Sequence, residues 1–297
     1  MAGGGSVRAI RDRIKSVRST AKVTRAMELV AASKMRRAQD RALASRPYAE
    51  RMTAVLSQLA AYTGAGDGQA LHPLLEQRTV QRVAYIHVTA DRGLAGGLNA
   101  NMNRAGASLV LRHQPNVSSI TVLPVGRKGR DFFARSGMPV AAEFTELGDF
   151  PDFEKVRPIA KIVMDDFLSG AVDQVFIGYQ RFVNAAVQRP TTRQILPIVP
   201  PAGEDGAAKG ADFIFEPSPE RLLETLLPRY VEMQVYAAVL EARASEQSAR
   251  MVAMRQATDA ANEMVGALTL AYNKARQESI TGELLDIVGG VAALEAK

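Results

Sequence analysis

The chain has 297 residues, of which 47% are hydrophobic and 23% charged, and its formal net charge is +6. This composition is typical of a soluble, folded protein with one or two domains. Cysteine is absent, which excludes disulfides, thiol catalysis and zinc–thiolate sites, and no run of about 18 uncharged apolar residues predicts a membrane span. The positive excess is concentrated in residues 1–52, which therefore need solvent or an acidic partner.

The first segment, residues 1–62, is predicted to form one long helix. Small and apolar residues recur over residues 7–59 at alternating spacings of three and four, which is the heptad pattern of a coiled coil. Pro47 lies inside this pattern and is expected to kink or divide the helix. The glycine-rich stretch after Thr63 ends it.

The last segment, residues 218–297, repeats the same pattern. Ser218-Pro219 is a typical helix start, and the heptad spacing then continues over residues 223–275. Some 70 helical residues would span roughly 100 Å at about 1.5 Å per residue, more than a domain of this size can bury alone. Such a helix needs a partner, so we expect the two end segments to pair as an antiparallel coiled coil.

The middle segment, residues 63–217, has a different sequence pattern, in which strands alternate with helices. Four β-rich runs occur at residues 83–88, 120–123, 175–179 and 195–198, and helical patterns at 98–112, 128–135 and 153–168 separate the first three. Alternating strands and helices predict an α/β domain with a parallel sheet. A polar, glycine- and proline-rich linker follows at residues 200–210.

Known catalytic signatures are missing from this middle segment. It contains no Walker-type phosphate loop, no His-Glu-x-x-His helix and no Gly-x-Ser-x-Gly elbow. His87 lies in a strand pattern and is interpreted as structural. The turn at residues 91–99 lies where a dinucleotide-binding loop would, but its glycine spacing is not Gly-x-Gly-x-x-Gly. We favour a tight strand-to-helix turn, with Asp91 bonding nearby backbone, and keep a nucleotide-binding enzyme as the alternative function.

A basic run in the first helix includes Lys34, Arg36, Arg37 and Arg41. Its residues alternate with the apolar positions and no aromatic side chain accompanies them, so a solvated helix face is the default interpretation. An acidic protein partner is the second interpretation, and a nucleic-acid partner is the third.

Several longer motifs resemble one known family. They are Thr24-Arg25-Ala26-Met27-Glu28-Leu29-Val30, the turn at residues 91–99, Ser245-Glu246-Gln247-Ser248-Ala249-Arg250 and Tyr272-Asn273-Lys274-Ala275-Arg276-Gln277. Together they are similar, in the same order over nearly the whole chain, to the gamma subunit of F-type ATP synthases. The resemblance implies a fold in which a long antiparallel coiled coil of the end helices (1–62 and 218–297) carries an inserted Rossmann-like α/β domain (63–217).

The same resemblance implies a function and its partners. The chain would be the central-stalk rotor of a proton-translocating ATP synthase, without catalysis or cofactor of its own. It would couple rotation of the c-ring to conformational cycling of the catalytic beta subunits. The implied partners are the alpha and beta subunits of the F1 head, the epsilon subunit and the c-ring of Fo, with no nucleic acid. The complex would place the chain at the cytoplasmic face of a bacterial plasma membrane, in preference to the mitochondrial inner membrane.

The resemblance also assigns contact residues. Those implied for the alpha and beta subunits are Met27, Arg276, Gln277, Thr281, Leu284, Leu285, Val288, Val291 and Leu294. Those implied for the c-ring and the foot of the stalk are Lys34, Arg36, Arg37 and Tyr48. No catalytic, cofactor-binding or metal-binding residue is implied.

Overall fold

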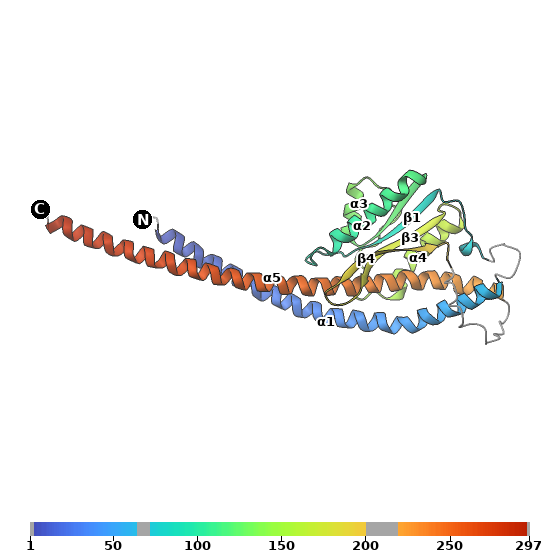
Figure 1. Ribbon diagram of the computed structural model, residues 1–297, viewed down its shortest axis with the longest axis horizontal. Helices are drawn as coiled ribbons and strands as arrows, with labels where there is room; N and C mark the ends of the chain where they lie inside the picture. The colour runs from blue at the N-terminus through green and yellow to red at the C-terminus, as the bar shows by residue number, and fades with distance from the viewer. Residues whose placement is uncertain (1–2, 64–71, 200–218, 296–297) are drawn as a thin grey trace. The chain divides into compact units, whose positions relative to one another are not determined.

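The computed structural model describes residues 3–63, 72–199 and 219–295 (Figure 1). The predicted linker at 200–210 and Ser218 lie outside this part. The chain forms two compact units: residues 1–30 with 251–297, and residues 31–250. Two long helices, α1 (Gly3–Thr63) and α5 (Pro219–Glu295), contribute to both units. The three-part division at 62/63 and 217/218 stays a prediction.

The first unit is an antiparallel helix pair, formed by the start of α1 and the end of α5 (Figure 1). The seam is made of small and medium side chains: Val17 and Ala21 of α1 pack with Ala261 of α5, and Val265 and Leu268 lie against them. These residues occupy the predicted heptad positions, because a period close to 3.5 keeps one face of each helix toward its partner. The predicted pairing of the two end segments is confirmed in this unit.

Polar residues interrupt this seam at two levels. The hydroxyl oxygens of Thr24 and Thr258 lie 2.7 Å apart. Glu28 is only 3% exposed and accepts hydrogen bonds from Arg255 (3.0 Å) and Arg25 (2.8 Å). The hydrogen bond from Arg255, helped by Arg25, holds the pKa of Glu28 below its usual value despite burial. Both levels match particular residues of α1 with particular residues of α5, and so favour one axial register.

The second unit is built on a four-stranded sheet with the order β2-β1-β3-β4. The strands are β1 (Arg82–Val88), β2 (Ser119–Val125), β3 (Gln174–Phe182) and β4 (Gln188–Leu196). β1 pairs with β2 and with β3 in parallel, so the predicted parallel sheet is confirmed for these three strands. Their apolar runs are buried on both faces, as expected for parallel strands covered by helices.

The fourth strand corrects the prediction. β4 runs antiparallel to β3, with Arg181 opposite Arg189. A connection of only five residues (183–187) joins the two strands, and a connection this short permits only an antiparallel pair. The predicted run at 195–198 covers only the end of β4, because most of this edge strand is polar and exposed.

Helices cover both faces of the sheet (Figure 1). On one face, α2 (Leu98–His113) and α3 (Arg127–Arg135) pack against Tyr85 and Val122. On the other, α4 (Phe153–Leu168) and α5 build the larger core with Ile86 and Ile177. Two short 3-10 helices, η1 (Pro73–Leu75) and η2 (Gln114–Asn116), complete the unit. The three helices predicted between the strands are confirmed within one residue at each end.

The proline in α1 does not divide the helix, which continues from Gly3 to Thr63 with Pro47 inside it. A proline removes one hydrogen bond from the ladder, and the bonds on either side keep the helix continuous. Farther along α1, Met52 joins the larger core of the second unit.

Candidate interaction surfaces

The last part of α5 carries large apolar side chains that are exposed in the described part of the chain. Figure 1 shows α5 running on past the N-terminal end of α1. The exposed apolar side chains there are Ile280, Leu284, Leu285, Ile287, Val288 and Val291. At 3.6 residues per turn they fill an arc of about 160° around the helix. An arc of this width is normally buried against a core, so its exposure makes this end of α5 a candidate docking surface.

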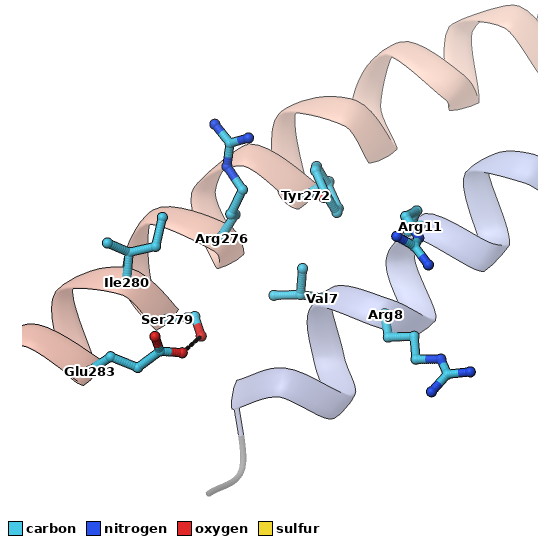
Figure 2. Close-up of a pocket in the computed structure, with 8 residues that line it drawn as sticks. All are labelled: Val7, Arg8, Arg11, Tyr272, Arg276, Ser279, Ile280 and Glu283. Carbon is cyan, nitrogen blue, oxygen red and sulfur yellow. Dashed lines mark hydrogen bonds between the residues drawn. The ribbon is translucent and has the colours of Figure 1, made fainter.

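A shallow groove of about 440 Å³ lies beside this apolar end, between α1 and α5 (Figure 2). Figure 2 shows Val7 and Tyr272 pointing toward each other across it, while Arg276 points away from α1. Arg8 and Arg11 complete the basic lining. The one acidic lining residue is Glu283, which accepts a hydrogen bond from the hydroxyl of Ser279 at 3.4 Å. The groove is therefore basic, and it suits an acidic partner.

The residues assigned to the alpha and beta subunits belong to the first unit, and all except Met27 lie toward this end of α5. Arg276, Gln277 and Thr281 are exposed on α5, and Met27 is half-buried on α1. Leu284, Leu285, Val288 and Val291 belong to the exposed apolar arc. Leu294 lies in the last turn of α5, and its side chain is outside the described part of the structure.

The residues assigned to the foot lie on the part of α1 that belongs to the second unit. Arg36 and Arg37 are exposed, and so is Tyr48. Lys34 is different, because its ammonium group contacts the carboxylate of Asp149 at 2.6 Å. Part of the basic run therefore already has an acidic partner within the chain.

The glycine turn is bonded to the neighbouring helices. The carboxylate of Asp91 accepts a hydrogen bond from the backbone N–H of Arg127 (3.1 Å) and lies 3.5 Å from the guanidinium of Arg243. The carbonyl of Gly93 accepts a hydrogen bond from Arg250 at 3.3 Å. Asp91 thus bonds backbone as predicted, but the partners come from α3 and α5 and not from the turn itself. The glycine turn is therefore fastened to α5 by Arg243 and Arg250.

His87 has a structural environment. It is fully buried, its Nε2–H donates to Asn103 at 2.9 Å, and its Nδ1 accepts from the hydroxyl of Tyr85 at 3.1 Å. Burial lowers the pKa of His87 to about 4, so the ring is neutral near pH 7. This agrees with the interpretation of His87 as a structural histidine.

Sequence reasoning missed a buried polar stretch of α5. Arg243, Ser245, Glu246, Gln247 and Ser248 are all buried, although polar residues on a long helix are normally interpreted as its solvated face. The available signal was the loss of periodicity, since this stretch has polar residues on every side of the helix and no single apolar stripe.

Within residues 3–63, 72–199 and 219–295, no group of three or more histidine and acidic side chains is arranged to hold a metal ion. Over the same ranges, no helix has both the length and the apolarity to cross a membrane.

These features define a class of protein: a helix pair with an uncovered apolar end and a basic groove, built to dock into a larger assembly. A family model described as ATP synthase matches residues 6–294. An ATP synthase gamma chain from Dehalococcoides mccartyi is 54% identical over 289 residues, covering 97% of this chain and 99% of that protein. One from Roseiflexus castenholzii is 51% identical over 290 residues, covering 97% and 98%. The chain therefore belongs to the ATP synthase gamma-chain family.

Solved structures agree with this assignment. A chain in the central stalk and c-ring structure of the Tetrahymena thermophila mitochondrial ATP synthase matches with a TM-score of 0.59 and 25% identity, covering 79% of this chain and 99% of that chain. A chain of the Euglena gracilis mitochondrial ATP synthase has the same fold, with a TM-score of 0.66 and 22% identity, covering 99% and 96%. The resemblance and the fold class inferred from the sequence are both confirmed.

Proposed function

We propose that this chain is the central-stalk rotor subunit of a proton-translocating ATP synthase, and that it couples rotation of the c-ring to conformational cycling of the catalytic beta subunits. The family supports the assignment, and the observation that carries it is the exposed apolar arc from Ile280 to Val291. A soluble chain that exposes such an arc gains stability by inserting it into an apolar sleeve of a partner.

The mechanism follows from the asymmetry of one helix pair. A single α1–α5 pair has no threefold symmetry, so three equivalent beta subunits arranged around it would meet different side chains. Each beta subunit would then prefer a different conformation, because contacts that favour one state shift its population. Rotation of the pair exchanges these contacts in turn, which makes mechanical work and nucleotide affinity interconvertible.

The contact residues are proposed on the same basis. In the F1 head, Met27, Arg276, Gln277 and Thr281 would meet polar and acidic loops of the alpha and beta subunits, where a guanidinium can form charge-assisted hydrogen bonds to carboxylates. The apolar end would fill the sleeve with Leu284, Leu285, Val288, Val291 and Leu294.

A second surface would meet the foot of the stalk. Arg36, Arg37 and Tyr48 are exposed and available to the c-ring, and the epsilon subunit would bind near this unit. Lys34 would also contact the c-ring while it stays bonded to Asp149, so it would both stabilise the second unit and take part in the contact. The chain would thereby be a peripheral component of a membrane-bound complex, at the cytoplasmic face of a bacterial plasma membrane.

ATP chemistry is assigned to the partner subunits and not to this chain. The bonds from Arg243 and Arg250 to the glycine turn support this assignment, as does the burial of His87. We therefore expect the purified chain to lack ATPase activity of its own.

A matched pair of variants tests the proposal. The double variant Leu285→Gln with Val288→Gln removes apolar surface from the arc. The control, Leu111→Gln, removes a leucine from α2 that is equally exposed: Leu111 is 67% exposed and Leu285 is 66% exposed. After co-expression with alpha and beta subunits, we expect the double variant to lower the recovered complex by at least about tenfold, since two buried apolar side chains contribute on the order of 3 kcal/mol. Leu111→Gln should assemble normally. Robust ATP hydrolysis by the chain alone, or normal assembly of the double variant, would overturn the proposal.

A further inference from the structure

One short part of α5 is enclosed on all sides. Residues 242–248 are seven consecutive buried residues. A helix packed on one face exposes the other, so an unbroken run of nearly two turns requires neighbours around the whole circumference. The segments to which its polar side chains bond belong to the second unit, residues 31–250.

The side chains in this stretch bond to separate segments of the α/β domain. We call the following six residues the collar: Arg243, Ser245, Glu246, Gln247, Ser248 and Arg250. Ser245 donates to the carbonyl of Gln180 in β3 at 2.8 Å. Ser248 donates to the carbonyl of Ala185 in the β3–β4 connection at 2.6 Å.

The remaining collar residues bond to a third and a fourth segment. Gln247 donates to the carboxylate of Asp149 at 3.1 Å, and the other oxygen of Asp149 accepts from Lys34 of α1. Arg243 and Arg250 reach the glycine turn, as described above. Glu246 lies between these two arginines and accepts from Arg243 at 2.8 Å and from Arg250 at 2.7 Å.

These bonds point in different directions around the helix axis. Successive residues are rotated by about 100°, so Ser248 and Ser245 lie about 140° and 200° away from Arg243. Gln247 and Arg250 lie within about 40° of Arg243, on either side. If α5 turned about its own axis within the domain, it would break bonds on opposite sides together.

The part of α5 that precedes the collar is held mainly by an apolar face, with two directional bonds beside it: Arg157 of α4 donates to Glu232 at 3.0 Å, and Tyr236 donates to the carbonyl of Pro151 at 3.4 Å. There the buried residues Leu223, Leu227, Val231, Val235 and Val239 recur about every four residues and form one apolar face on the larger core. Apolar contacts are not directional, so such a face resists separation more than it resists small rotations or sliding. Hydrogen bonds and ion pairs depend on angle and distance, and they fix both.

We infer that the collar is the joint that transmits torque between the α/β domain and α5. The inference rests on the proposed rotor function, because only a chain that turns inside its partners has to carry torque across this junction. The positioning residues are Glu246, which orients both arginines, and Ser245 and Ser248, which fasten the opposite side. Weakening the collar is expected to leave assembly and hydrolysis intact while letting the helix slip relative to the domain.

The principal variant is Glu246→Gln, which keeps the shape of the side chain but removes the charge that orients Arg243 and Arg250. The matched control is Val239→Ala, which weakens the apolar face of the same helix. Both are assembled with the partner subunits. The readouts are thermal unfolding, ATP hydrolysis, protons pumped per ATP, and the angular fluctuation of a bead fixed to the α/β domain while the head is immobilised.

Glu246→Gln should raise the angular variance of the bead about twofold and lower the number of protons pumped per ATP, while the rate of ATP hydrolysis stays unchanged. The reason is that Arg243 and Arg250, no longer oriented by Glu246, do not hold the glycine turn cooperatively. Val239→Ala should lower the unfolding temperature without changing the variance or the pumping ratio. Ser248→Ala offers a milder version of the first variant if Glu246→Gln fails to fold.

A disulfide across the collar tests whether the collar acts as a mechanical joint or whether Glu246 has a purely electrostatic role. The natural chain has no cysteine, so within this chain Ala185→Cys with Ser248→Cys can form only the intended disulfide across the collar. In the Glu246→Gln background, oxidation should restore low variance and normal pumping, and a reductant should reverse both effects. Normal variance in Glu246→Gln, or no rescue by a disulfide shown to have formed, would overturn the inference alone. A natural chain that never couples hydrolysis to pumping would overturn the proposed function and the inference with it.

Discussion

The two units of this chain are stabilised in opposite ways. The second unit buries large side chains such as Tyr85, Phe133 and Phe167 on both faces of a sheet. The first unit is a seam of small residues, with Ala21 and Ala261 at its centre and two polar levels in place of large apolar layers. Each small seam residue removes little apolar surface from water, and its stabilisation is correspondingly small.

The difference indicates which unit is complete by itself. In the second unit, the apolar groups of α5 pack within the chain, and the polar side chains of the collar bond within it, apart from the buried Nε of Arg243. In the first unit, the same helix exposes an apolar arc and a basic groove. We therefore expect changes in the second unit to act on folding, and changes in the first to act on register and on binding to partners.

The largest expected effect is a loss of folding stability from a single methyl group in the second unit. A Cβ added at Gly178 would lie 2.0 Å from the hydroxyl oxygen of Tyr85 and 2.8 Å from the terminal carbon of Met102, both inside the core. Gly178→Ala should therefore cost about 3 kcal/mol of unfolding free energy or more, since a packed core cannot move aside. Gly93→Ala, where a Cβ would meet nothing within 4 Å, is the matched control and should change stability little. Equal denaturant midpoints for the two variants would contradict a tightly packed second unit.

The second-largest effect is a loss of folding stability at low pH, and it comes from the burial of His87 in the second unit. Burial lowers the pKa of His87 from 6.5 to about 4, so as the pH falls the unfolded chain binds this proton first. The folded state is unaffected above about pH 6.5 and loses about 3 kcal/mol relative to the unfolded state as the pH falls toward 4. Denaturant titrations across this range should show the loss, and His87→Gln should remove this part of the slope. An unchanged slope in the variant would mean that other groups carry it.

Much of this contrast could be predicted from sequence. The heptad spacing identified the seam of the first unit because it depends only on local periodicity. The runs around Ile86, Val122 and Ile177 identified three strands because strands buried on both faces are continuously apolar. The motifs around Met27 and Arg276 identified the family, and with it the placement of the candidate contact residues, which stays a prediction.

The features that sequence did not predict depend on partners far apart in the chain. Lys34 was assigned to the foot, but it bonds to Asp149, and Asp91 bonds to Arg127 and Arg243. The collar was not recognised because Ser245 and Glu246 have the composition of a solvated helix face. Edge strand β4 was placed too late because its polar, exposed residues give no apolar signal.

The smallest expected effect is local and confined to the first unit. Glu28→Gln keeps the side chain's shape in the seam but removes the charge that Arg255 and Arg25 contact. Both arginines are largely exposed and can turn to solvent, which limits the cost to about 1 kcal/mol. That cost corresponds to about fivefold faster hydrogen exchange in the amides of residues 14–28 and 254–268, with exchange in the second unit unchanged.

The matched control is Glu278→Gln, which removes the charge of an exposed glutamate in the same unit. The carboxylate of Glu278 forms a long ion pair, 4.0 Å from the ammonium group of Lys274. It should leave exchange unchanged, because an exposed ion pair of this kind contributes little. If both variants exchanged at the natural rate, the polar levels would not hold the register, and the small apolar residues of the seam would have to fix it alone. If Glu28→Gln also loosened the sheet, the two units would unfold together, and the contrast between a complete unit and one that depends on partners would not hold.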